Sequence, residues 1–259
     1  MYFTLKKLIT SYILWVIVIP SSTIAEAIHI ANGEWPPYHS KKLKHYGFAS
    51  HIITLAFAEE GMSVKYDFLP WKRGMYMAKQ GKLDGTAVWR KKDEFQKYFY
   101  YSEPIFETET VFFHLKSLTF HWKKFSDLKG LVIGGTIGYG YNKDYDLAEK
   151  SNQYSIKRVI SDEINFHKLI LSRIDIFPIT KEVGYHILKT KFPSKVNIIT
   201  HHPTPLTPEA ERSLHLLISK KSRKHELILK SFNRGLKKLR EKGKLTILYN
   251  NLEQGKYIK

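Results

Sequence analysis

The order of the hydrophobic patterns is the most restrictive feature of this chain, because strand and helix patterns alternate in two successive units. In the first unit, strands are expected over residues 28–31, 63–69 and 84–89, with helices over 48–60 and 73–80. The second unit carries strand patterns over 131–134, 155–159, 174–179 and 196–199, with helices over 141–149, 163–172 and 181–190. An alternation of strand, helix and strand favours a parallel sheet with right-handed crossovers. The sequence therefore predicts an α/β fold with two parallel-rich sheets.

Two β-rich runs connect these units: residues 109–115 lie between them, and residues 213–219 follow the second. If the chain leaves the first unit through one run and returns through the other, the helix expected over 221–242 packs back on the first unit. We therefore predict two lobes joined by a two-strand hinge, with lobe 1 formed by 28–112 and 217–259 and lobe 2 by 113–216. Ligands of open α/β sheets bind beyond the carboxyl ends of the strands, so the site is expected in the cleft between the lobes.

The first 27 residues have the three parts of a secretory signal peptide. Lys6 and Lys7 precede an apolar run over residues 8–19, and the small-residue segment that follows ends with Ala25-Glu26-Ala27. We expect cleavage after Ala27 and a mature chain in the periplasm. The apolar run has 12 residues. A membrane-spanning helix needs roughly 20, so a retained anchor is the less favoured alternative.

Composition removes several classes of function. Among 259 residues, 42 Lys and Arg face 24 Asp and Glu, a formal charge of +18 that favours anionic partners. Nucleic acid, nicotinamide cofactors and nucleoside triphosphates are not expected for an exported protein, since those pools are cytoplasmic. The absence of cysteine excludes disulfides, thiolate metal sites, a cysteine nucleophile and a lipid-modified N-terminal cysteine. The twelve histidines include no pair four residues apart on a helix, so we predict no metal, no cofactor and no catalytic residue.

After the predicted signal peptide, six short segments occur in a fixed order along the predicted mature chain. They are GEWPPY at 33–38, PWKR at 70–73, GKLDG at 81–85, YSEP at 101–104, DLKG at 127–130 and SRID at 172–175. Together they resemble the extracellular solute-binding proteins of family 3, in particular the polar amino acid receptors of ABC importers. The resemblance implies a type II periplasmic-binding-protein fold, in which two lobes close on a small solute and present it to a membrane permease. It also implies a monomeric binding protein rather than an enzyme.

The chain departs from this family at the amino acid clamp. The receptors carry an arginine for the ligand α-carboxylate seven residues before the position of Ser102, where this chain has Phe95. Arg90 is the candidate to replace it. The aspartate that such receptors offer to an α-amino group corresponds to Thr180, with Glu182 as the nearest acid. These departures count against an ordinary α-amino acid as the ligand.

Three loops of lobe 1 that follow strand ends each offer aromatic side chains, and two of them add an arginine. These candidate ligand-binding residues are Trp35, Tyr38, Trp71, Arg73, Trp89 and Arg90. Aromatic rings stack on flat or aliphatic ligands, and a guanidinium captures a carboxylate or phosphate through two hydrogen bonds. Each residue also has an ordinary structural explanation, as part of a loop that covers the sheet or as a surface residue at a helix start.

A glycine-rich turn over residues 135–141 offers a second set of candidates in lobe 2. Backbone N–H groups at Thr136, Ile137, Gly138 and Tyr139 precede a predicted helix, where an anion can bind. Thr180 completes the expected site at another strand end. A purely structural turn is the alternative. If both lobes offer cationic or N–H groups, the solute is small and anionic or zwitterionic, with a carboxylate, sulfonate or phosphate.

Two other functions of the same architecture remain open. The protein could sense a ligand and act on a membrane receptor, or it could be a periplasmic dehydratase-like enzyme that acts on cyclic acids.

The segment over residues 220–244 carries eleven Lys and Arg against two acids. Its apolar positions follow helical spacing, so its basic side is exposed to solvent, to anionic lipid or to the permease.

Overall fold

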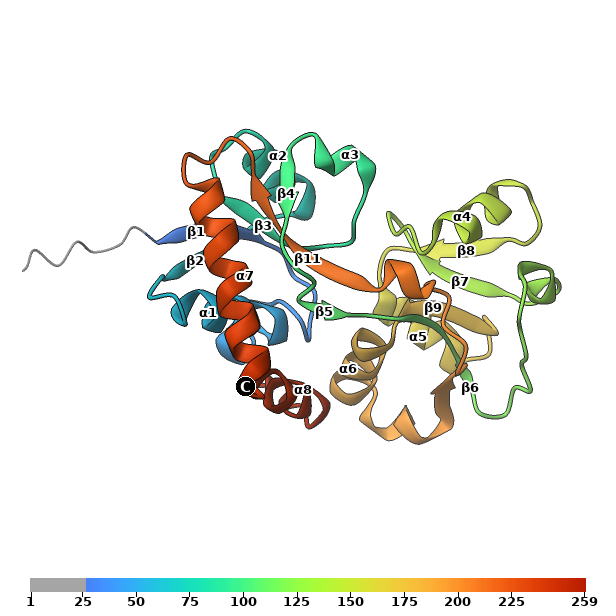
Figure 1. Ribbon diagram of the computed structural model, residues 1–259. Coiled ribbons are helices and arrows are strands. Elements are labelled where there is room, and N and C mark those ends of the chain that lie inside the picture. The colour runs from blue at the N-terminus through green and yellow to red at the C-terminus, as the bar shows by residue number, and fades with distance from the viewer. Residues whose placement is uncertain (1–26) are drawn as a thin grey trace, which may run out of the picture.

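The computed structural model describes residues 27–259, and these form two α/β lobes side by side (Figure 1). Apart from Ala27, the predicted signal peptide lies outside the described residues. Each lobe is built around one sheet with helices packed against it, which confirms the predicted fold class.

The first lobe contains a six-stranded sheet in the order β2, β1, β3, β11 and β4, with β5 paired to β11. Strands β2 and β3 run parallel to β1, whereas β11 is antiparallel to its three partners. The strands are β1 (Ile28–Asn32), β2 (Val64–Phe68), β3 (Gly85–Trp89), β4 (Phe99–Tyr101), β5 (Phe106–Glu107) and β11 (Ser213–Ser219). The helices are η1 (Lys44–Tyr46), α1 (Phe48–Ala58), α2 (Trp71–Lys79), α3 (Asp93–Gln96), α7 (His225–Glu241) and α8 (Lys244–Glu253).

The second lobe contains a five-stranded sheet in the order β10, β6, β9, β7 and β8. Its strands are β6 (Thr110–Leu115), β7 (Ile133–Thr136), β8 (Ile156–Val159), β9 (Ile176–Thr180) and β10 (Ile199–His201). Its helices are η2 (Phe125–Leu128), α4 (Lys143–Lys150), α5 (Asp162–Ile170), α6 (Lys181–Lys191), η3 (Pro193–Ile198) and η4 (Glu209–Glu211). Because β7, β8 and β9 are parallel, their carboxyl ends lie at one edge of the sheet.

The chain crosses between the sheets twice. Strand β6 pairs with β9 and β10 of the second sheet, and β11 pairs with strands of the first. The two crossings, 108–109 and 202–212, are tied together where the N–H of Thr108 donates to the carbonyl of Arg212 at 3.1 Å. The lobe boundaries were expected after residue 112 and before residue 217, and these positions lie inside β6 and β11. A strand belongs to a single sheet along its whole length. The chain therefore crosses between the lobes before each of these strands begins, a few residues earlier than expected.

Several local expectations were wrong. The strand predicted over 196–199 is the end of the 3-10 helix η3, and pairing begins only at Ile199. The last long helix begins at His225 rather than at residue 221, and a further helix, α8, follows it after Gly243. Three short elements, α3, β4 and β5, were not predicted, because segments of two to four residues contain too little periodic pattern to be recognised.

Helices α1 and α7 pack closely in the core of the first lobe. Phe57 and Phe232 are fully buried, with ring centroids 5.2 Å apart. Close approach of the two backbones depends on Gly235 of α7, because a Cβ there would overlap the carbonyl oxygen of Ala56. The returning C-terminal helix is therefore part of the first lobe, as the sequence predicted.

We expect Gly235→Ala to destabilise the protein. Alanine favours a helix by about 1 kcal/mol over glycine, but the overlap with Ala56 forces the helices apart at a cost of roughly 1–3 kcal/mol or more. Urea unfolding should give a lower midpoint than that of wild type. The exposed replacement Lys237→Ala on the same helix is the control, and a Gly235→Ala protein as stable as this control would contradict the packing described.

Candidate functional site

A cavity of about 190 Å³ lies between the two lobes. Most of its lining comes from residues at or just after the carboxyl ends of strands, the position expected for a ligand site in open α/β sheets. The lining residues are Trp35 and Arg90 from the first lobe, and Thr110, Tyr139, Gly140, Tyr141, Asp162, Ile179, Thr180 and Val183 from the second. We call this space the cleft cavity.

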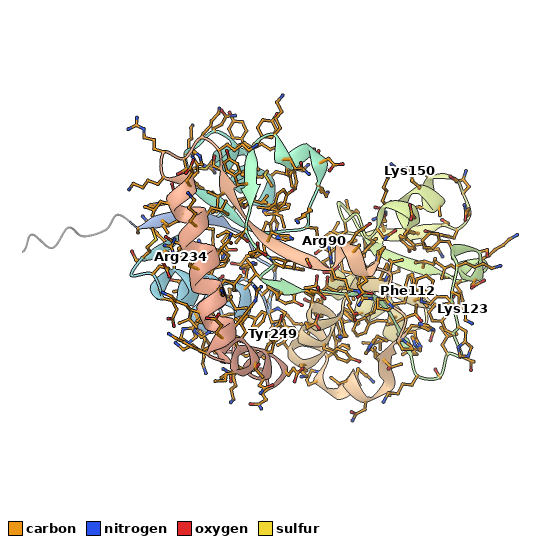
Figure 2. All side chains as sticks on the ribbon, in the orientation of Figure 1. Arg90, Phe112, Lys123, Lys150, Arg234 and Tyr249 are labelled. Carbon is orange, nitrogen blue, oxygen red and sulfur yellow. The ribbon has the colours of Figure 1, made fainter. Side chains whose placement is uncertain are left out.

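Arg90 follows β3 and lies at the junction of the lobes (Figure 2). One guanidinium nitrogen donates to the carbonyl oxygen of Glu211, and the other donates to the hydroxyl of Thr108 at 2.9 Å. The side chain therefore binds both chain crossings. Burial lowers the pKa of Arg90, although an arginine keeps its charge at any physiological pH. Since these partners are a carbonyl and a hydroxyl, the positive charge is held in place without a carboxylate bonded to it.

Asp162 is the acidic group of the cleft cavity and was missed in the sequence. It opens α5 directly after β8, with Ser161 as the N-cap. Its carboxylate accepts hydrogen bonds from the hydroxyls of Thr136, at 2.5 Å, and Tyr139, at 3.2 Å. Burial raises the pKa of Asp162, and these two hydrogen bonds oppose the rise. Its position after a strand end, the rule that selected Trp35, could have identified it.

The cleft cavity thus has opposite charges on its two walls. The guanidinium belongs to the first lobe and the carboxylate to the second, and each is held by neutral hydrogen-bonding partners. Arg90 and Asp162 are both partly buried, and a charge withdrawn from water without a counter-charge is costly unless a ligand supplies one. This arrangement suits a small molecule with a carboxylate at one end and an ammonium group at the other.

In the backbone turn after β7, three of the four N–H groups that were expected to bind an anion are bonded within the protein. The N–H of Thr136 donates to the hydroxyl of Tyr141 at 2.7 Å, that of Ile137 to the carbonyl of Val159 at 2.8 Å, and that of Tyr139 to Thr136. The Ile137 side chain is 58% exposed, and Gly138 lies at the tip of the turn with a φ of 84°. Of the four turn candidates, only Tyr139 lines the cleft cavity. The turn contributes phenol groups rather than an anion-binding loop.

The aromatic candidates of the first lobe divide into two groups. Trp35 lines the cleft cavity, but Trp71 and Trp89 pack edge to face with centroids 5.5 Å apart and do not line it. Arg73 is exposed on α2 and is likewise outside the lining. Of the residues that the sequence suggested, Trp35, Arg90, Tyr139 and Thr180 come together at the cavity. Trp71 instead covers Gly33 from outside the cavity.

Tyr38 is 1% exposed and joins the lobes instead of lining the cavity. Its ring packs against Trp35, with centroids 4.5 Å apart, and its hydroxyl donates to the carboxylate of Glu182 on α6 at 2.8 Å. Burial, with the neighbouring charge of Glu182, raises the pKa of Tyr38 well above its ordinary value. The phenol therefore stays protonated and remains a donor to α6.

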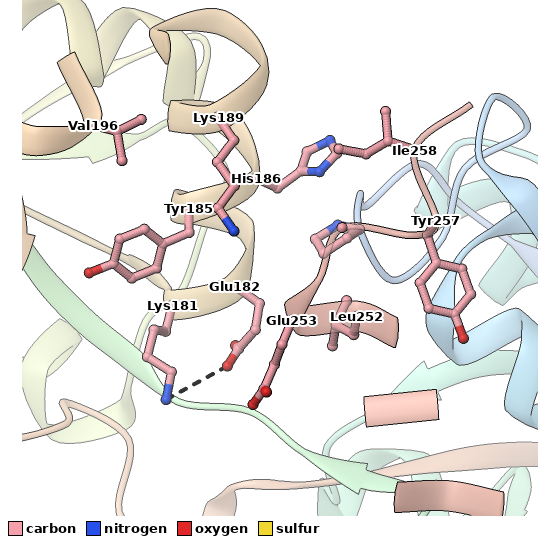
Figure 3. Close-up of a pocket in the computed structure, with 12 residues that line it drawn as sticks. Lys181, Glu182, Tyr185, His186, Lys189, Val196, Leu252, Glu253, Tyr257 and Ile258 are labelled. Carbon is pink, nitrogen blue, oxygen red and sulfur yellow. Dashed lines mark ion pairs between the residues drawn. The ribbon is translucent and has the colours of Figure 1, made fainter. Parts of the chain in front are cut away.

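A second, larger cavity of about 420 Å³ lies on the other side of this contact, between α6 and the C-terminal segment (Figure 3). Lys181 on its wall lies 3.7 Å from Glu182 and 3.6 Å from Glu109, and Lys189 and Glu253 also line it. Size alone would favour this cavity. The cleft cavity differs from it in being lined by strand ends from both lobes.

The described residues, 27–259, contain no cluster of three or more histidine, aspartate or glutamate side chains suited to a metal ion. In the same part of the chain, no helix combines the length and the apolar character needed to cross a bilayer.

Residues 28–252 match the model of the bacterial extracellular solute-binding proteins, family 3. The chain belongs to this family. The resemblance drawn from the short segments is thereby confirmed, and the family consists of binding proteins. A curated relative, an uncharacterized protein of Shewanella oneidensis, is 26% identical over 156 residues, which cover 56% of this chain. The match spans only about half, 55%, of that relative's length.

Solved structures with this fold include binding proteins and a sensor. A mutant of ArgBP from T. maritima has a TM-score of 0.66 at 17% identity, over 88% of this chain and 95% of its own. The amino acid ABC transporter protein AbpA from Streptococcus pneumoniae, bound to L-arginine, has a TM-score of 0.67 at 15% identity, over 90% and 96%. A histidine kinase sensor domain also reaches 0.67 at 15% identity, over 88% and 96%. At these identities the likeness concerns the fold.

We expect Asp162→Asn to stabilise the folded protein at neutral pH. Because the folded-state pKa of Asp162 is raised above its ordinary value of 3.8, the charged carboxylate costs stability above that raised pKa. This cost disappears as the pH falls through the raised pKa. The difference in unfolding free energy between the variant and wild type should therefore shrink as the pH approaches 3.8. Urea unfolding at several pH values measures this gap. Glu163→Gln, at an exposed acid paired with Lys191, is the control, and a variant less stable than wild type at pH 7 would contradict the assignment.

We expect Tyr38→Phe to open the ligand-free protein. The change removes the hydrogen bond between the lobes, worth about 1 kcal/mol, and leaves the ring packing in place. Small-angle scattering should give a larger radius of gyration than wild type. Tyr257→Phe removes a hydroxyl bonded to His51 within the first lobe and should leave the radius unchanged; equal radii for all three proteins would argue against an interlobe role for Tyr38.

Proposed function

We propose that this protein captures a small zwitterionic solute of the amino acid type in the cleft cavity, by closing its two lobes around it. The observation that carries the proposal is the pairing of Arg90 on one lobe with Asp162 on the other, neither of which is bonded to a group of opposite charge. The solute's carboxylate bonds to Arg90 and its ammonium group to Asp162. A purely anionic solute is less suitable, because it would meet a carboxylate on the second wall.

In this proposal, the two charged residues that hold an amino acid in the related receptors are replaced by charged residues at other positions of the chain. Arg90 takes the place of the arginine that is missing at Phe95, and its anchoring by Thr108 and Glu211 orients it toward the cavity. Asp162 at the end of β8 takes the place of the acid that is missing at Thr180. Thr180 still lines the cavity, and Trp35 provides an aromatic face against which the rest of the solute packs.

Closure follows from contacts that exist only when both walls reach the solute. A ligand shifts an equilibrium between open and closed forms by the difference between its binding free energies for the two forms. Contacts with Arg90 alone would be the same in both forms, whereas the addition of Asp162 favours the closed one. The ligand free energy therefore drives the hinge, and no chemical step is involved. Turnover of any bound solute by the purified protein would contradict this.

The importer role rests on the family and on transporter relatives such as AbpA, and the periplasmic location on the predicted signal peptide. We propose delivery to an ABC permease by a monomeric carrier. A sensory role is the second candidate, favoured by the likeness to a histidine kinase sensor domain. Cells lacking the protein should lose uptake of the solute if it serves an importer. Loss of a transcriptional response, with uptake intact, would favour the sensor.

We expect Arg90→Gln and Asp162→Asn each to weaken binding of the solute at least about thirtyfold, since loss of one member of a buried charge pair costs about 2–5 kcal/mol. Thermal-shift screening of amino acids first identifies the ligand, because a solute that binds the folded state raises the melting temperature. Calorimetry then measures affinity. The controls are Arg173→Gln, at an exposed arginine outside the cavity, and Glu163→Gln.

Two ligand analogues make this experiment sharper. The analogue without the amino group should bind wild type weakly, and the Asp162→Asn change should reduce its affinity little further. The analogue without the carboxylate should also bind wild type weakly, and the Arg90→Gln change should reduce its affinity little further. If either variant binds the intact solute as tightly as wild type, that residue does not contact the ligand. If both do, the site lies elsewhere.

A further inference from the structure

Two groups of positive charges in the first lobe differ in their partners. On and after α7, most cations have a carboxylate: Glu60 contacts Arg234, at 2.7 Å, and Lys238, at 2.8 Å (Figure 2 labels Arg234). Glu59 accepts hydrogen bonds from Lys242 and Lys244, and these lower its pKa to about 2. The basic side of this helix, expected to be a free polycation, is therefore largely neutralised.

A second group of cations gathers where α2, the α3–β4 segment and the loop from β11 to α7 meet. We call this surface the basic face; it consists of Lys79, Lys82, Lys97, Lys220, Lys221 and Arg223. Contacts join the three segments. The ammonium of Lys220 donates to the carbonyl of Gln96 at 2.6 Å, and that of Lys221 to the side chain of Gln80 at 3.3 Å. In Figure 1 these elements lie along the top of the first lobe, the same end at which α7 begins.

The partners of these cations are neutral. Lys79 lies over the ring of Tyr98 at 4.7 Å, Lys97 over the same ring at 5.7 Å, and Lys220 over Tyr100 at 4.9 Å. Within residues 27–259, no carboxylate lies within ion-pair distance of any of the six. The nearby acids are engaged elsewhere: Asp84 accepts from Ser222, and Glu226 pairs with Lys230. Asp93 and Glu94 lie at the start of α3, one turn before Lys97, and Asp93 accepts a hydrogen bond from Gln96 at 3.3 Å.

Exposed tyrosines lie among these lysines. Tyr100 is 40% exposed, and Tyr76, one turn before Gln80 on α2, is 59% exposed. Amphipathic tyrosine rings with neighbouring lysines are typical of surfaces that lie at the headgroup level of a membrane.

The basic face also lies near the start of β1. The N–H of His29 in β1 donates to Asp84, whose other oxygen accepts from Ser222 in the basic loop. The first residue of β1, Ile28, therefore lies beside this face. The cleft cavity is at the opposite end of the sheet, since Trp35 and Arg90 follow the other ends of β1 and β3. A membrane bound at the basic face leaves the cleft accessible.

We propose that the basic face binds the anionic phospholipid surface of a membrane and holds the protein there with its cleft exposed. The attraction is electrostatic, so it weakens with salt and requires anionic headgroups. The proposal does not depend on the identity of the solute.

The test measures co-sedimentation with lipid vesicles. The full chain is expressed, and the exported protein is mixed with protein-free vesicles of phosphatidylglycerol and phosphatidylethanolamine, or of phosphatidylcholine alone. Wild type should bind the anionic vesicles in low salt and not the neutral ones. The triple variant Lys82→Glu, Lys97→Glu and Lys221→Glu should bind them at least about tenfold more weakly.

A matched variant separates this face from the overall charge of the protein. Lys116→Glu, Lys123→Glu and Lys129→Glu change the net charge by the same amount at exposed positions of the second lobe and should retain binding. The proposal would be overturned if both triple variants lost vesicle binding equally, or if the wild-type protein did not bind anionic vesicles. Binding only to native membranes, sensitive to protease, would indicate a protein partner instead. Unchanged melting temperatures show that each variant folds.

Discussion

The double crossing of the chain between its sheets is the constraint on which the rest of this structure depends. Strands β6 and β11 belong to different sheets, and the segments leading to them are joined by the bond between Thr108 and Arg212. Arg90 adds bonds to both segments from the end of β3. The two lobes are therefore held together at this junction. The strand ends of both sheets line the same space, the cleft cavity.

The charges in that space support the proposal that the clamp of this chain differs from the one usual in its family. An arginine and an acid are both present, but each comes from a neighbouring strand end rather than from the usual position. Arg90 is held by backbone carbonyls and a hydroxyl, and Asp162 by two hydroxyls. Such neutral partners fix a side chain without cancelling its charge, which leaves both groups available to a ligand.

The sequence predicted the two-lobed fold and the returning helix because strand and helix periods are local and repeat over many residues. It predicted the site less completely. Trp35, Arg90, Tyr139 and Thr180 follow or end strands, and the cavity includes them. Tyr38 and Trp71 occupy equally suggestive positions, but long-range packing buries one against Phe106 and turns the other toward Trp89. Asp162 resembles an ordinary first-turn helix acid, and only the tertiary structure brings it opposite Arg90.

The order of the strands along the chain also determines which lobe can be completed first. All strands of the second sheet come from one continuous stretch, β6 to β10, so that lobe needs no later part of the chain. The first sheet has β11 at its interior and α7 against α1, so it remains unfinished until the last fifth of the polypeptide has been delivered. The half that carries β1 is therefore the last to be completed, because two of its elements lie at the C-terminal end of the polypeptide.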